Sequence, residues 1–181
     1  LIIPFDLAIS STWERTFVEG RKDWFEWLPE ENDPIYGSLY SHVKGAHSMA
    51  DSIGGEGKTF GFYSANLMRK YGPDWAVKWR DSVYSRLRHW GFNTIANWSQ
   101  EDVLVNSDLP FVAGTGLHNV RLIENARGYW RKMVDVYDVS FQENVSSSIK
   151  NIAEKYGQNP LCIGYYVDNE LAWEGIIEGV L

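Results

Sequence analysis

Hydrophobic residues in the middle of the chain recur at the spacing of a helix. They follow one another every three or four positions and therefore share one helical face: Ala76, Trp79, Val83, Leu87 and Trp90. Pro73 precedes this run and suits a first helical turn, and Gly91 follows it and suits a helix end. The pattern predicts a helix over residues 75–90.

A second run with the same periodicity occurs later in the chain. Its apolar positions are Phe141, Val145, Ile149, Ile152 and Tyr156. Either Asp138 or Ser140 can cap the first turn, and Gly157 and Pro160 stand where the helix would end. The pattern predicts a long helix between these two signals.

Short apolar runs alternate with the predicted helices. Residues 92–98, 109–116 and 161–167 each suit a strand, and residues 1–10 suit a first strand in spite of Pro4. The run 161–167 is almost continuously apolar, which is typical of a strand covered on both faces. Strands that alternate with helices indicate an α/β fold with a parallel sheet.

The N-terminal third is less regular. We expect short helices over residues 21–29 and 63–72, with a polar, glycine-rich stretch at 45–57 between them. The whole chain is expected to form one domain. It would consist of an irregular region over 1–72 that holds the first strand, and of β/α units over 73–181.

Composition and charge narrow the class of protein. The 181 residues carry a net charge of −7, which disfavours nucleic acid as a partner because phosphates need a basic surface. No apolar run approaches the roughly 20 residues that cross a bilayer, and the first residues lack the basic leader of a signal peptide. Cys162 is the single cysteine, so neither a disulfide nor a cysteine metal cluster is expected.

The stretch SIGGEGKT, residues 52–59, comes close to a phosphate-binding loop. Gly57, Lys58 and Thr59 fit the motif G-x-x-x-x-G-K-[ST], but Ser52 stands where the first glycine belongs. Such a loop must follow a buried strand and open a helix, and the sequence on either side has neither pattern. We expect a flexible surface loop, with nucleotide binding as the less favoured alternative.

The four histidines lack the spacing of a metal site. His42, His47, His89 and His118 form no H-E-x-x-H pair and have no cysteine beside them, so no metal and no cofactor is expected. His89 lies on the predicted helix 75–90 and is expected at the surface. His118 follows the predicted strand 109–116, at the end where parallel α/β folds bind ligands.

Polar and aromatic side chains gather at the carboxyl ends of three predicted strands. They are Asn97, Trp98, His118, Asp168, Asn169, Glu170 and Trp173. Amide and acid groups beside tryptophan rings suit a sugar, which presents hydroxyl groups at its rim and C–H groups on its face. The pattern favours a carbohydrate site over polar residues that merely end strands.

Several stretches resemble a known family. GFNTIANWS and YYVDNELAW, with ANLMRKYG and VEGRKDWFEWLP earlier in the chain, are similar to clan A glycoside hydrolases, in the branch of β-agarases and β-galactosidase-like enzymes. The similarity covers roughly residues 17–175. It implies a (β/α)8 TIM barrel, of which this chain would form the first half, with about four β/α units.

The resemblance also implies roles for the residues at the strand ends. In that family the Asn-Glu pair ends barrel strand four, so Glu170 would be the general acid/base and Asn169 would bind the sugar hydroxyl next to the cleaved bond. A carboxyl in a partly desolvated site can hold the raised pKa that a proton donor needs. The substrate would be a galactan or an agarose-like polysaccharide. The further substrate-binding residues would be Asn97, Trp98, His118 and Trp173.

Retaining hydrolysis also needs a nucleophilic carboxylate about 5 to 5.5 Å from the acid. In clan A enzymes it ends strand seven, and the strands predicted here reach only the fourth, so we expect the 181-residue chain by itself to be inactive. Asp168 shares a strand face with Glu170 by the two-residue period and is expected to be a structural or orienting residue rather than a nucleophile. The alternative is a carbohydrate-binding fragment without catalysis.

A half-barrel would have open edges. Two unpaired strands and an apolar inner face would be exposed, and such surfaces favour association. We therefore expect a homodimer through the open barrel edges, because a two-fold interface covers both copies at once. A polysaccharide-active family favours a secreted or periplasmic location.

Overall fold

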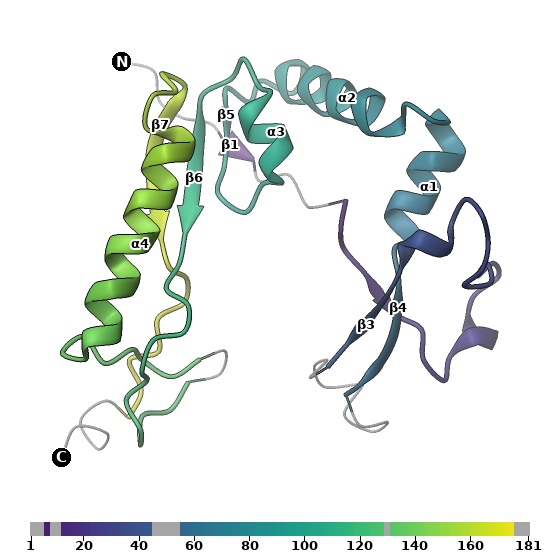
Figure 1. Ribbon diagram of the computed structural model, residues 1–181. Helices are drawn as coiled ribbons and strands as arrows, with labels where there is room; N and C mark the ends of the chain where they lie inside the picture. Colours follow the sequence, from purple (N-terminus) through teal and green to yellow (C-terminus); the bar gives the residue numbers. More distant parts are fainter. Residues whose placement is uncertain (1–5, 8–11, 45–54, 129–130, 176–181) are drawn as a thin grey trace. The chain divides into compact units, whose positions relative to one another are not determined.

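The computed structural model describes residues 6–7, 12–44, 55–128 and 131–175. The chain divides into two compact units, each with its own sheet (Figure 1). The parallel-sheet unit consists of Leu1–Ile9 and Gly91–Leu181, and the antiparallel-sheet unit of Ser10–Trp90. No helix in the described residues combines the length and the apolar character needed to cross a membrane.

The parallel-sheet unit has the strand order β1-β5-β6-β7, and each neighbouring pair is parallel. The strands are β1 (Asp6–Leu7), β5 (Thr94–Ile95), β6 (Phe111–Thr115) and β7 (Cys162–Val167). Helices α3 (Glu101–Val105) and α4 (Val139–Tyr156) connect β5 to β6 and β6 to β7. The predicted α/β class and parallel sheet are confirmed, whereas α3 lies in a segment expected to be a short connection.

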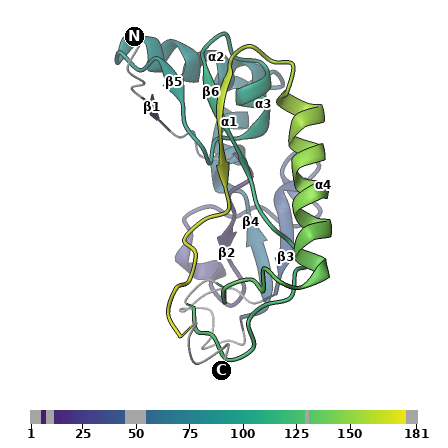
Figure 2. The ribbon, with the colours of Figure 1, turned by 90° about the vertical axis from the view of Figure 1, so that its left-hand side faces the viewer.

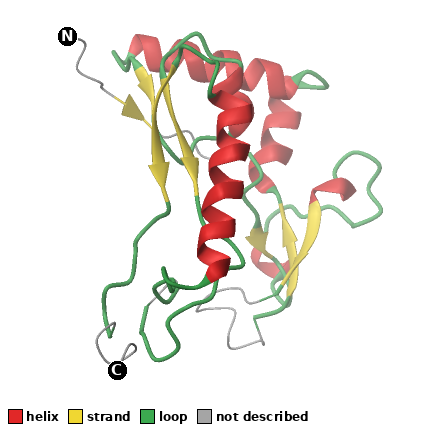
Figure 3. Cartoon of the chain, turned by 60° about the vertical axis from the view of Figure 1, so that its left-hand side comes forward, coloured by secondary structure: helices red, strands yellow, loops and turns green. Residues whose placement is uncertain are grey.

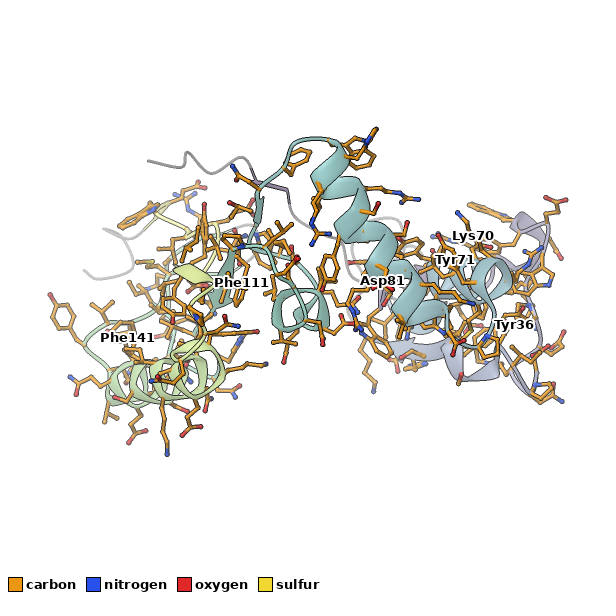
Figure 4. The ribbon with its side chains drawn as sticks, turned by 90° about the horizontal axis from the view of Figure 1, so that it is seen from above. Tyr36, Lys70, Tyr71, Asp81, Phe111 and Phe141 are labelled. Atoms are coloured by element: carbon orange, nitrogen blue, oxygen red, sulfur yellow. The ribbon has the colours of Figure 1, made fainter. Side chains whose placement is uncertain are left out.

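Helix α4 begins where its cap was expected. The carboxylate of Asp138 accepts a hydrogen bond from the backbone N–H of Ser140 at 2.9 Å, and Tyr156 ends the helix before Gly157. α4 lies alongside β6 (Figures 2 and 3), and the rings of Tyr156 and Phe111 meet edge to face with centroids 5.5 Å apart (Figure 4, which labels Phe111). Ile149 was expected on the buried stripe but is 59% exposed.

Strand β7 has exposed side chains on both faces, so the expectation that it is covered on both is wrong. It pairs with β6 on one side, and no other described strand pairs with it. Ile163, Tyr165 and Val167 alternate along one face and are all exposed, Val167 at 68%. The apolar run therefore predicted the strand correctly but not the burial of its side chains. The same run of residues occurs whether or not another segment packs on the strand.

The antiparallel-sheet unit contains a sheet that the sequence analysis missed. Its order is β2-β4-β3, and the strands are β2 (Thr16–Phe17), β4 (Gly57–Phe60) and β3 (Tyr40–Val43). The helix expected over residues 21–29 is wrong, because only the 3-10 turn Lys22–Trp24 forms before Phe25 adopts an extended backbone. A second 3-10 turn covers Gly37–Leu39.

Two helices complete this unit. α1 (Phe62–Tyr71) and α2 (Trp75–His89) confirm the predicted helices over 63–72 and 75–90. Trp79, Val83 and Leu87 are buried as predicted, His89 is exposed as predicted, but Trp90 is 56% exposed because it lies beyond the helix end. The hydrophobic core around β4 is formed by Val18, Leu39, Phe60 and Ala65.

The stretch that resembles a phosphate-binding loop is largely a strand. Gly57, Lys58 and Thr59 lie in β4, so the flexible loop expected at these positions is wrong; residues 52–54 lie outside the described residues. The Lys58 amine pairs with the Glu31 carboxylate at 2.5 Å. A helix does follow, but the lysine is engaged by a carboxylate and the glycine is extended in a sheet, which does not suit a phosphate cradle.

Candidate functional site

A cavity of about 600 Å³ lies along strands β6 and β7 and helices α3 and α4 and extends to the carboxyl ends of the parallel strands. It is lined by side chains of these helices, by the segments that follow β5, β6 and β7, and by the strand residues Val112, Gly114, Thr115 and Tyr166. Four of the six predicted site residues line it, namely Asn97, Trp98, His118 and Asn169. Their proximity follows from the fold, because parallel strands deliver their carboxyl ends to the same edge of a sheet.

Asn97 reaches the cavity across strand β6. A Cβ atom added to Gly114 would stand 2.3 Å from Oδ1 of Asn97, so only a glycine leaves room for the amide there. Trp98 follows directly and is 68% exposed. The short strand β5 thus places a hydrogen-bonding amide and an aromatic ring at one side of the cavity.

Backbone strain is concentrated in the same segments. The non-glycine residues with positive φ in the described chain are Trp98, Asn119, Asp168 and Glu170, with φ values of 70°, 56°, 61° and 45°. All four follow β5, β6 or β7 at the carboxyl edge. The left-handed conformation costs an ordinary residue about 1–2 kcal/mol, and such strain gathers at functional sites. Its position here supports a site at this edge.

Helix α4 holds the segment after β6 in place. The side-chain Oδ1 of Asn144 accepts a hydrogen bond from the backbone N–H of His118 at 3.0 Å, and Nδ2 of Asn144 donates to the carbonyl of His118. One turn later, Ser148 Oγ donates to the carbonyl of Gly116 at 3.2 Å. Neither Asn144 nor Ser148 was predicted from the sequence, although polar positions spaced by four beside an apolar stripe are a usable signal.

An ion pair joins the segments after β6 and β7. Nη2 of Arg131 lies 2.6 Å from Oδ2 of Asp168, and Nη1 of Arg131 donates to the carbonyl of Leu117 at 2.5 Å. Asp168 also donates its backbone N–H to the carbonyl of Thr115 at 2.7 Å. Asp168 was expected to be an orienting residue, and these contacts agree with that role. No local pattern in the sequence marks Arg131.

Glu170 and Trp173 stand apart from the cavity. Both are exposed, and neither is among the side chains that line the cavity. Glu170 follows the carboxyl end of β7, but β7 is an edge strand and not the central strand that was expected. The shared strand face of Asp168 and Glu170 is also wrong, because β7 ends at Val167 and the left-handed residues break the two-residue period.

Where helices α3 and α4 line the cavity, two opposite charges neutralise each other. Lys155 of α4 pairs with Glu101 of α3, and this hydrogen bond raises the pKa of the Lys155 amine. Burial raises the pKa of the neighbouring Tyr156 hydroxyl. The described residues hold no cluster of three or more side chains suited to bind a metal ion. The other polar groups that line the cavity include amides, an imidazole and a carboxylate, and together they suit a ligand rich in hydroxyl groups.

The chain is similar to two curated β-agarases of Vibrio sp. strain JT0107. It is 32% identical to β-agarase B over 160 residues and 30% identical to β-agarase A over 128 residues. These matches cover 86% and 68% of this chain but only 16% and 13% of the relatives, so the chain spans a small part of their length. No family model matches the chain.

Solved structures agree with this similarity. The structure of PfGH50B matches with a TM-score of 0.71 and 31% identity, over 83% of this chain and 21% of that protein. The agarase AgWH50C matches with a TM-score of 0.77 and 27% identity, over 94% and 26%. An exo-β-agarase matches with a TM-score of 0.70 and 31% identity, over 81% and 20%. The homologues of this chain are thus β-agarases, which are glycoside hydrolases, and its mixed α/β fold matches parts of agarase structures.

Proposed function

We propose that this chain forms the acid/base half of a glycoside hydrolase barrel that acts on an agarose-like galactan. The observation that carries the proposal is the meeting of three strand ends at one cavity in a chain whose homologues are β-agarases. Asn97, His118 and Asn169 would bind sugar hydroxyl groups there, and Trp98 would stack on a sugar face.

The strand order supports a half-barrel. β1, β5, β6 and β7 are parallel and adjacent in the order of the sequence, as the first four strands of a (β/α)8 barrel are. In this proposal Glu170, at the end of the fourth strand, is the general acid/base, and Asn169 binds the hydroxyl next to the cleaved bond. The nucleophilic carboxylate of a retaining mechanism would come from outside these four strands. The chain alone would therefore bind sugar without cleaving it.

One observation favours the alternative of a carbohydrate-binding fragment without catalysis. Glu170 is exposed and does not line the cavity that gathers the other predicted residues. A general acid works best in a partly desolvated site, where its pKa is raised. The alternative predicts that Glu170 has no effect on any activity, whereas the barrel proposal predicts that it is essential once the nucleophile is supplied.

The exposed face of β7 supports self-association. Ile163, Tyr165 and Val167 present apolar side chains next to an unpaired strand edge. We propose that a second copy of the chain covers this face in solution, since a two-fold pairing would bury both edges.

Binding and hydrolysis measured side by side test the proposed function. Calorimetric titration with oligosaccharides prepared from agarose should show binding, weakened roughly tenfold in Asn169→Ala by the loss of a hydrogen bond. Reducing-end assays should show no hydrolysis by the 181-residue chain. Absence of binding would overturn the carbohydrate function. Hydrolysis that disappears in Glu170→Gln would mean that this chain supplies its own second carboxylate.

A further inference from the structure

Gly116 leaves an open position between two polar side chains of the cavity. It directly follows β6 and lines the cavity together with His118 and Asp168. A Cβ atom added to Gly116 would stand 3.7 Å from Nε2 of His118 and 3.9 Å from Oδ1 of Asp168. The space above this glycine therefore borders both an imidazole nitrogen and a carboxylate oxygen.

Neighbouring glycines differ from Gly116. The corresponding space at Gly114 is filled by the Asn97 amide, whose Oδ1 lies 2.3 Å from the added Cβ. At Gly164, in β7, no atom of the described residues comes within 4 Å of the added Cβ, so none of them could hold a ligand group there. Gly116 combines room for an additional atom with two polar atoms that face it.

The carboxylate of Asp168 is held by contacts that leave it capacity for a ligand, and the backbone that carries the His118 ring is fixed. Asp168 uses Oδ2 for the ion pair with Arg131, and its Oδ1 accepts a hydrogen bond from the backbone N–H of Asn169 at 3.0 Å. A carboxylate oxygen has a second lone pair and can accept another hydrogen bond. The backbone of His118 is fixed by the Asn144 amide on both its N–H and its carbonyl. The Asp168 carboxylate and the backbone of His118 are thus in place before a ligand arrives.

We propose that the space over Gly116 is a hydroxyl-binding subsite of the sugar site. A ligand oxygen about 1 Å closer to both atoms than the added Cβ would lie at hydrogen-bond distance from them. The hydroxyl donates its proton to Oδ1 of Asp168 and accepts a hydrogen bond from Nε2 of His118. This inference rests on the proposed function and assigns Asp168 a binding role in addition to its orienting role.

Gly116→Ala tests the subsite by filling it. The added methyl group would make only ordinary van der Waals contacts, and φ of Gly116 is not in the left-handed region, so the fold should be kept. Binding of agarose oligosaccharides, measured by calorimetry, should weaken about 10- to 100-fold through the loss of a hydrogen bond to a charged group. Gly164→Ala is the matched control, because it makes the same chemical change in open space and should bind as the wild type does.

The outcomes separate this inference from the proposed function. If the wild type binds and Gly116→Ala binds equally well, the subsite is wrong and the carbohydrate function stands. If the wild type does not bind, both the subsite and the carbohydrate function are wrong. Nitrogen NMR of the His118 ring needs no variant and provides a second readout. The Nε2 signal should shift when the oligosaccharide binds, and an unmoved signal under saturating ligand would overturn the subsite.

Discussion

Arg131→Ala is the substitution that tests most directly whether the segments after β6 and β7 depend on each other. It removes the partner of Asp168, whose carboxylate is 2.6 Å from the guanidinium and whose side chain is only 15% exposed. It also removes the hydrogen bond from Arg131 to the carbonyl of Leu117. The carboxylate would then remain in a half-closed site without its counter-charge.

The expected loss in the free energy of unfolding lies between two limits. Exposed ion pairs contribute about 0–1 kcal/mol, and removal of one partner of a buried pair costs about 3–5 kcal/mol. The Arg131 side chain is 33% exposed, so a cost of about 2 kcal/mol is expected for the partly buried pair. With a urea m-value of about 2 kcal/mol per M, the unfolding midpoint should fall by about 1 M.

Urea unfolding followed by circular dichroism measures this effect. Arg127→Ala is the control, because its 3.9 Å pair with Glu174 is exposed and should contribute less than about 0.5 kcal/mol. In an Asp168→Asn background, Arg131→Ala should cost only about 1 kcal/mol, since no unpaired carboxylate is left. An Arg131→Ala variant as stable as Arg127→Ala would refute the reasoning.

Three further changes have defined outcomes. Gly57→Ala would place a Cβ 2.6 Å from that of Glu19 and should destabilise the protein by about 1–3 kcal/mol in urea unfolding. Hydrogen bonds from Ser140 hold the pKa of the Asp138 carboxyl below its usual 3.8. The stabilising contribution of Asp138 should therefore be present above the pKa of the unfolded state and be lost as the pH falls through the pKa of the folded state. In urea unfolding across acidic pH, the free energy of unfolding should decline more steeply for the wild type than for Asp138→Asn. Ile163→Lys should abolish the self-association that sedimentation equilibrium detects in the wild type, and a wild type monomeric at every concentration would contradict the pairing.

Elements with local signals could be predicted from the sequence. The cap formed by Asp138 and Ser140 spans two residues, and the periodicity of α2 and α4 is visible within each helix. The parallel order of the strands followed from their alternation with helices. Because parallel strands end at one edge, the cluster of Asn97, His118 and Asn169 could also be predicted, and the cavity they line agrees with that prediction.

Features that join distant residues become visible only in the folded chain. The sheet β2-β4-β3 pairs Thr16 with Phe60, positions far apart in the sequence, so no single window of sequence indicates it. The pair of Arg131 and Asp168 joins positions 37 residues apart. Exposure of β7 depends on which segments pack against its faces, and its own composition does not encode this. Local patterns specify what each segment can form, whereas burial and ion pairing depend on which segments meet.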